Sequence, residues 1–114
     1  MSGGHNIPVP RAGELKWRLT LLKRSVRPNG AGEAIETFEP LQEVWSKVMP
    51  WVGRDYYGAA QEQNELQTIF LIRFRRDIDS KDRVRYQGED FNIIEVAELG
   101  YRQALELLCL KAPH

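Results

Sequence analysis

One stretch of the sequence concentrates positive charge and is the best place to look for chemistry. Its cations are Arg73, Arg75, Arg76, Lys81, Arg83 and Arg85. Alternate arginines on neighbouring strands would form a cationic stripe of the kind that follows a phosphate backbone. Carboxylates are interleaved with these cations, namely Asp77, Asp79, Asp82, Glu89 and Asp90. Because opposite charges on adjacent strands commonly pair, we favour a solvated face with cross-strand ion pairs and keep DNA or an acidic partner as the alternative.

No catalytic motif accompanies the basic stretch. The sequence lacks a glycine-rich phosphate loop, a Cys-x-x-Cys pair and a His-Glu-x-x-His motif, and both histidines lie near its ends. Asp77, Asp79 and Asp82 match a calcium loop only in part, since the glycine and the distal glutamate are missing at the required spacing. Cys109 lies within an apolar run, which predicts a buried, unreactive thiol. We therefore predict that the chain is not an enzyme and that it holds no cofactor or metal.

Four aromatic residues surround Pro50 and suggest either a core or a contact surface. They are Trp45, Trp51, Tyr56 and Tyr57. Aromatic side chains are common both in protein interiors and at the centres of interfaces. We predict that Trp45 is a core residue and that Tyr56 or Tyr57 anchors an interface.

Composition limits the classes of protein to which the chain can belong. Its 114 residues suit one domain, and 42% of them are hydrophobic while 28% are charged. No apolar run approaches the roughly 18 residues of a membrane-spanning helix, so we expect no membrane contact. The formal net charge is zero, so no global field would gather nucleic acid. Any contact with DNA would have to be local.

The beginning of the chain predicts a flexible N-terminal segment, a strand and a loop. Glycine and proline residues make residues 1–13 a flexible N-terminal arm, which lacks the pattern of a signal peptide. We place a single domain at 14–112 and a short C-terminal end at 113–114. Strict alternation over 15–21 predicts a strand. Turn-forming residues then predict a long exposed loop from Ser25 to Thr37, in which Asn29, Gly30 and Gly32 would provide mobility.

The remaining segments predict further strands. Residues 44–49 and 68–76 have strand patterns, and 82–96 reads as a hairpin with Gly88 in its turn. Residues 55–64 favour one or two helical turns. Residues 101–110 fit both helix and strand, and local propensity favours helix. The expected fold is mainly β: a small antiparallel β-barrel of about six strands with one short helix and a long exposed loop.

The order of these motifs resembles that of a known family. In sequence they are Arg11 to Leu15, Val44-Trp45-Ser46-Lys47-Val48, Gly53 to Tyr57, Ile72-Arg73-Phe74, Asp82 to Gly88, Phe91-Asn92-Ile93 and Leu107-Leu108-Cys109. In this order and total length the chain resembles, over about 11–111, the head-tail joining proteins of long-tailed phages, also called head closure or stopper proteins.

The resemblance implies a structural protein of the virion. Family members assemble in many copies as a ring beneath the portal-bound adaptor, close the DNA-filled head, and offer a surface to the tail completion or tail tube protein. It implies transient contact with packaged DNA, a place in the host cytoplasm before assembly, and a strand rather than a helix at the C-terminal segment. Family loops project toward neighbouring subunits or the channel, and Ser25 to Thr37 is the matching candidate here.

Residue roles under this resemblance are hypotheses about contacts. We assign Tyr56 and Tyr57 to an adaptor or neighbour interface. Contacts between subunits or with the channel are assigned to Arg73, Arg75 and Arg83, and those of the channel or subunit loop to Asn29, Gly30 and Gly32. The alternative function is a single-stranded nucleic-acid-binding β-barrel that uses the arginine stripe and exposed aromatic residues.

Overall fold

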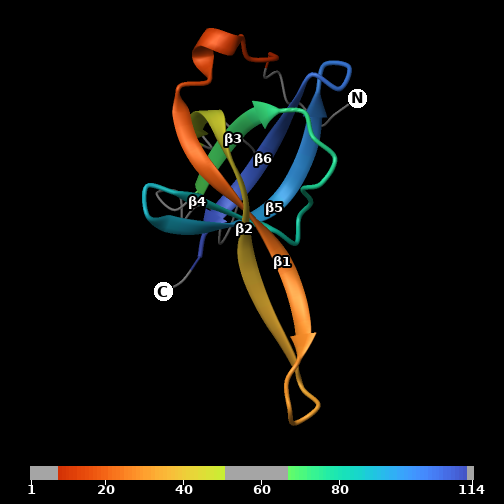
Figure 1. Ribbon diagram of the computed structural model, residues 1–114. Coiled ribbons are helices and arrows are strands. Elements are labelled where there is room, and N and C mark those ends of the chain that lie inside the picture. Colours follow the sequence, from red (N-terminus) through yellow and green to blue (C-terminus); the bar gives the residue numbers. More distant parts are fainter. Residues whose placement is uncertain (1–7, 51–66, 113–114) are drawn as a thin grey trace, which may run out of the picture.

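Six antiparallel strands close into a ring in the computed structural model, which describes residues 8–50 and 67–112 (Figure 1). The strands are β1 (Trp17–Pro28), β2 (Ala34–Pro50), β3 (Gln67–Arg73), β4 (Arg83–Tyr86), β5 (Glu89–Leu99) and β6 (Ala104–Lys111). Around the barrel their order is β1, β2, β3, β6, β5, β4. The mainly β fold class predicted from the sequence is confirmed.

The helical part of the prediction turned out differently. The predicted helix at 55–64 lies outside the described residues. A 3-10 helix, η1 (Ala12–Glu14), occurs at the end of the segment 1–13 that we expected to be irregular and extends one residue beyond it. The Arg11 backbone amide donates to Glu14 Oε1 at 2.9 Å, which closes this turn. Among the described residues, no helix is long and apolar enough to cross a membrane.

The C-terminal segment is a strand, so the local helix preference was wrong and the resemblance was right. β6 pairs with β3 along Ala104 to Leu110 and with β5 along Ala104 to Lys111. Residues 104–109 are all buried. A segment that gains hydrogen bonds on both edges and buries both faces is more stable as a strand than its helix propensity suggests.

Aromatic packing fills the interior of the barrel. Phe70 is fully buried, and its ring meets those of Tyr86 and Phe91 edge to face, with centroids 5.3 and 5.4 Å apart. Such pairs add to the stabilisation that burial alone provides. A second cluster lies on the other face of β3, where Ile69 and Leu71 pack with Leu108 and others. Both faces of β3 are therefore buried.

The hairpin predicted at 82–96 is present as β4 and β5. Their register runs from Arg83 opposite Asn92 to Tyr86 opposite Glu89. The two linking residues, Gln87 and Gly88, have φ of 54° and 80°. Positive φ at both positions is the geometry of a type I′ turn, whose twist matches that of the strands it joins.

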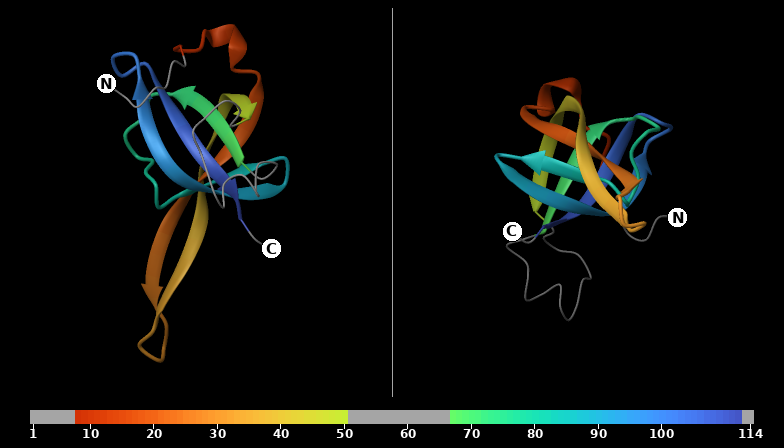
Figure 2. Two further views of the ribbon diagram at one scale, coloured as in Figure 1. Left: turned by 180° about the vertical axis from the view of Figure 1, so that it is seen from behind. Right: turned by 60° about the horizontal axis from the view of Figure 1, so that its bottom comes forward.

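The predicted long loop at 25–37 is instead mostly a β-ribbon. β1 and β2 stay paired out to Pro28 opposite Ala34, leaving only 29–33 as a connecting tip. The register shifts where Leu21 lies opposite Gln42 and Leu22 opposite Pro40, which makes Leu41 an extra residue in β2. Beyond this bulge the ribbon projects from the barrel, as Figures 1 and 2 show. We call residues 23–40 the arm.

Removal of the central ring of the core tests this description. We expect Phe70→Ala to lower the free energy of unfolding by about 3 to 5 kcal/mol, because it removes the ring between Tyr86 and Phe91 and leaves a cavity. Urea unfolding measures the change. Val26→Ala is the matched control, since Val26 is 47% exposed on the arm. A loss below about 1 kcal/mol for Phe70→Ala would contradict this packing.

Candidate interaction surfaces

The root of the arm is fixed by one buried carboxylate. Asp82 precedes β4, and its side chain is 1% exposed. Its oxygens accept hydrogen bonds from Lys23 Nζ at 3.0 Å, from the Arg24 backbone amide at 2.9 Å and from the Asp79 backbone amide at 2.9 Å. Its own carbonyl accepts from the Ile93 amide at 3.2 Å. Asp82 thereby joins β1, the turn before β4, and β5 at the point where the arm leaves the barrel.

A second contact at the root involves Arg83, one of the predicted interface residues. Its guanidinium lies 4.1 Å from the ring centroid of Phe38 on the arm, and its Nε donates to Asn92 Oδ1 at 2.7 Å. A cation over an aromatic face is attracted to the ring quadrupole. Arg83 therefore links Phe38 of the arm to Asn92 of β5 in the barrel.

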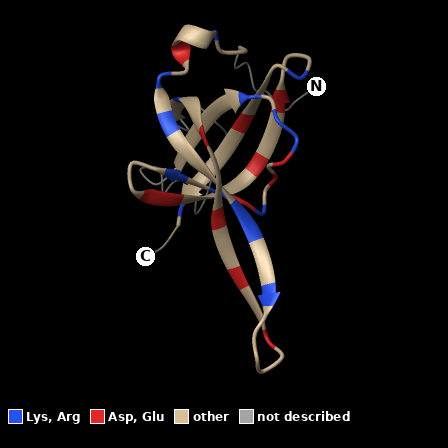
Figure 3. Cartoon of the chain, viewed as in Figure 1, with Lys and Arg blue, Asp and Glu red and all other residues tan. Residues whose placement is uncertain are grey.

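Charge pairs run along the arm (Figure 3). Arg24 pairs with Glu36, and Arg27 Nη2 lies 2.8 Å from Glu39 Oε2. Beyond Leu22, β1 pairs only with β2, and β2 joins β3 only from Lys47 onward. The strand edges of the arm are therefore free of ladder partners among the described residues. Val26 and Ile35 are 47% and 46% exposed.

The tip of the arm is organised around Asn29. Its Oδ1 accepts hydrogen bonds from the backbone amides of Ala31 at 2.8 Å and Glu33 at 2.9 Å. Its backbone amide donates to the Glu33 backbone carbonyl at 2.7 Å. Gly32 has a φ of 86°, which a residue with a side chain rarely adopts. The mobility that we expected at Asn29, Gly30 and Gly32, and their role in a subunit or channel loop, stay predictions.

A groove opens between β2 and the end of β3. β2 residues 42–45 pair with β1 on one side, while on the other side the ladder to β3 begins only at Lys47. The gap has a volume of about 300 Å³. Its lining residues are Leu15, Gln42, Glu43, Val44, Trp45, Arg73, Phe74 and Arg75. We call this gap the β2 groove, and it brings together two of the three arginines predicted to make contacts.

Trp45 is on the rim of this groove, so its assignment to the core was wrong. Its side chain is 51% exposed, and the Arg18 guanidinium lies 4.6 Å from its ring centroid. Trp45 lies in β2 beyond the last residue that pairs with β3, at a point where these two strands are no longer hydrogen-bonded to each other. An aromatic side chain at an open edge is available to a partner.

Two cations of the basic stretch, Arg75 and Arg85, form ion pairs with neighbouring carboxylates. Arg75 makes two hydrogen bonds to Asp77, at 2.6 and 2.9 Å, and Arg85 Nε lies 2.7 Å from Asp90 Oδ1. The hydrogen bonds that Arg75 donates to Asp77 lower the pKa of Asp77 below its ordinary value. The hydrogen bonds that Arg85 donates to the Asp90 carboxylate raise the pKa of Arg85. The cross-strand pair at Arg85 and the local pair at Arg75 support the interpretation that we favoured, while contacts of the arginines with a partner stay a prediction. Within the described ranges, Arg73 is exposed and has no ion pair.

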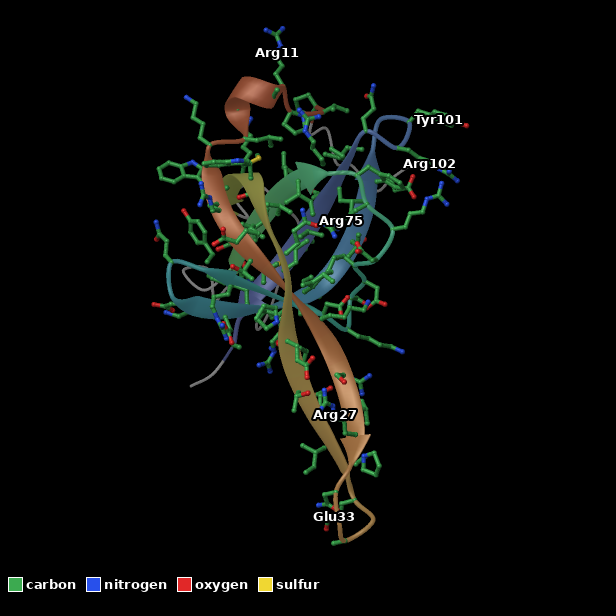
Figure 4. The ribbon with its side chains drawn as sticks, viewed as in Figure 1. Arg11, Arg27, Glu33, Arg75, Tyr101 and Arg102 are labelled. Carbon is green, nitrogen blue, oxygen red and sulfur yellow. The ribbon has the colours of Figure 1, made fainter. Side chains whose placement is uncertain are left out.

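Sequence reasoning missed the turn between β5 and β6. Tyr101 is 91% exposed there, and Figure 4 shows it pointing away from the barrel beside Arg102. Arg102 and Arg76 lie 6.0 and 5.9 Å from the ring centroid of Phe74. Gly100 between two apolar runs was the available signal, because glycine followed by polar residues is typical of a hairpin turn. The helix preference for 101–110 concealed it.

The remaining predicted residues carry less information. Tyr56 and Tyr57 lie outside the described residues. Cys109 is buried as predicted, and burial raises the pKa of its thiol. In the part of the chain that the structure describes, no group of three or more His, Cys, Asp or Glu side chains could hold a metal ion.

These features define a class: a small antiparallel β-barrel with a rigidly rooted, projecting ribbon and an open groove. A family model described as "Phage head completion protein" matches residues 10–113. The chain belongs to this family, and its role is therefore that of a structural phage-head protein. The resemblance to phage head-tail joining proteins noted from the sequence is confirmed.

Solved structures share the fold. Protein SF1141 from Shigella flexneri 2a is 23% identical, with a TM-score of 0.67 over 92% of this chain and 99% of that chain. A chain from the virion of a native gene transfer agent particle is 21% identical, with a TM-score of 0.65 over 90% of this chain and 97% of that chain. Among curated protein sequences, none matches.

Loss of the Asp82 carboxylate tests the root of the arm. We expect Asp82→Ala to lower the free energy of unfolding by about 2 to 4 kcal/mol, because two backbone amides and one ammonium lose their acceptor. Asp82→Asn should lose much of the same stability, because the new NH2 group is itself a donor and cannot accept hydrogen bonds from these donors. Glu43→Gln is the control, as Glu43 is an exposed carboxylate whose pair with Arg18 spans 3.5 Å.

Urea unfolding and hydrogen exchange at the Arg24 amide measure the two effects of the Asp82 variants. Faster exchange at Arg24 with an unchanged Glu43→Gln variant would support the anchoring role. If Asp82→Ala were as stable as the parent, Asp82 would not hold the arm.

The Arg75–Asp77 pair predicts a pH dependence. Because Arg75 lowers the pKa of Asp77 in the folded state, the pair contributes stability above the ordinary pKa of 3.8 and loses it as the pH falls further. Asp77→Asn should therefore be less stable than the parent at neutral pH, by at most about 1 kcal/mol because water screens the pair. The difference should vanish in acid.

Urea unfolding of the parent and of Asp77→Asn over a pH series measures this difference. Arg75→Gln removes the other partner of the same pair and should show the same pH dependence. A constant difference between parent and Asp77→Asn at all pH values would contradict the assignment.

Proposed function

We propose that this chain forms a ring below the portal-bound adaptor, where it closes the DNA-filled head and provides the attachment surface for the tail. The observation that carries the proposal is the arm. Among the described residues, both of its strand edges are free of ladder partners, and Val26 and Ile35 are exposed apolar side chains on it. A projecting ribbon with free strand edges is suited to contact another molecule.

Family membership over residues 10–113 supports the same conclusion, since the family is one of phage head completion. The fold of a chain from the gene transfer agent virion is consistent with it. In this proposal the partners are copies of the chain, the adaptor, and a tail completion or tail tube protein. The chain is in the host cytoplasm until it joins the virion, and it does no catalysis.

Electrostatics supports transient rather than tight contact with packaged DNA. The formal net charge is zero, and the pairing of Arg75 and Arg85 with carboxylates reduces the field of the arginine stretch. A protein that lines a passage for DNA benefits from weak attraction, because strong phosphate contacts would retain the duplex. The alternative of a single-stranded nucleic-acid-binding barrel would need a more continuous basic surface.

Binding to the cognate portal–adaptor complex tests the proposal. We expect the folded chain to bind the complex at micromolar concentration and to add a ring of density in electron micrographs. Portal without adaptor is the control and should bind little. Absence of binding to the portal–adaptor complex would contradict the proposed function, and salt-sensitive binding to single-stranded DNA would favour the alternative.

A further inference from the structure

The β2 groove and the tip of the arm have complementary side chains, but the two surfaces lie too far apart to meet within one copy of the chain. The groove offers an exposed tryptophan, Trp45, and an arginine, Arg73, that makes no ion pair with the described residues. The tip offers an exposed carboxylate, Glu33, and the start of β2, two residues further along the chain, offers Ile35, which is 46% exposed. Each surface thus combines an apolar group with a charge opposite to that of the other.

The charge on the tip is available to a partner. From the residues that the structure describes, the Glu33 carboxylate accepts a single long hydrogen bond, 3.3 Å, from the side-chain amide of Asn29. Other acids of the arm, Glu36 and Glu39, already pair with Arg24 and Arg27. Among the described acids of the arm, Glu33 is therefore the one that is not neutralised by a neighbouring cation.

Backbone geometry points to the same match. Within the described ranges 8–50 and 67–112, residues 42–45 of β2 have no strand partner on the side of the groove, because the ladder to β3 begins at Lys47. The strand edges of the arm likewise have no ladder partner in these ranges. An extended segment can add to an exposed strand edge through main-chain hydrogen bonds, while side chains beside it determine specificity.

The arm cannot reach the groove of its own chain. Asp82 and the contact between Arg83 and Phe38 hold its root, and it projects away from the barrel. Figure 4 shows Glu33 at the far end of the arm and Arg75, which lines the groove, on the barrel. The longest dimension of the molecule, 48 Å, reflects this separation.

We propose that the tip of the arm of one copy occupies the β2 groove of the next copy, with Glu33 facing Arg73 and Ile35 against Trp45. Tip and groove are different surfaces, so the contact is heterologous, and repeated copies related by a rotation close into a ring. The inference rests on the proposed function in taking neighbouring copies as the partners, and it names the surfaces through which they meet.

Charge reversal tests the pairing in the full chain. Glu33→Lys and Arg73→Glu should each weaken self-association by about tenfold, because each replaces an attraction by a repulsion. The double variant Glu33→Lys/Arg73→Glu should recover most of the loss. Lys81→Glu is the control, since Lys81 is an exposed cation outside both surfaces. Sedimentation velocity measures the association, and a double variant no better than the single variants would overturn the pairing.

A paramagnetic label locates the contact even if it is weak. A nitroxide is attached to Ala31→Cys, and native Cys109 is buried and so escapes labelling. The labelled chain is mixed at submillimolar concentration with isotope-enriched, unlabelled chain. We expect selective broadening of the Trp45 indole and Arg73 amide signals, and none from a label at Lys81→Cys. Unbroadened groove signals, or broadening spread evenly over the surface, would overturn the proposal.

The two proposals fail separately. If the chain binds the portal–adaptor complex as a ring while the label leaves Trp45 unaffected, the tip-to-groove contact is wrong and the proposed function stands. If the label broadens the groove signals while the chain ignores the portal–adaptor complex, copies associate as inferred but the site of assembly is wrong.

Discussion

The burial of a single carboxylate, Asp82, is the constraint on which the shape of this protein depends. A carboxylate removed from water is costly unless each of its oxygens finds donors. Here the donors come from Lys23, from the amide of Arg24 and from the turn at Asp79. Because these donors lie on the start of the arm and on the turn before β4, their hydrogen bonds hold the two segments together. The polar requirement of one side chain thus helps to fix the place where the arm leaves the barrel.

The barrel itself leaves the arm free to make contacts. β3 and β6 bury both faces, and the aromatic cluster around Phe70 fills the interior. The ring of strands is complete without the arm, since β1 meets β4 through Thr20 to Leu22 and β2 meets β3 from Lys47. Changes along the arm surface can therefore adapt it to a partner with little effect on the core. Such separation of a stable scaffold from a contact surface is common in proteins that assemble.

Much of the fold could be read from the sequence because its signals are local. Alternation predicted the strands, and Gly88 predicted the turn between β4 and β5. The arm was missed because Pro28, Asn29 and Gly30 are true turn residues, and their signal was extended over flanking residues that pair. Local propensity missed β6 because its strand conformation is stabilised by pairing with β3 on one edge and β5 on the other. Trp45 was misplaced because a sequence pattern does not show where β2 and β3 stop pairing, and the groove forms at that point.

The arm also has a mechanical consequence. It is held at its root by Asp82 and Arg83 and is unsupported by the described chain beyond Phe38, so it acts as a lever. A rotation of a few degrees at the root displaces Glu33 in proportion to the length of the ribbon, while the barrel hardly moves. The hydrogen bonds of Asp82 at the root therefore matter more for the position of Glu33 than any contact further along the ribbon.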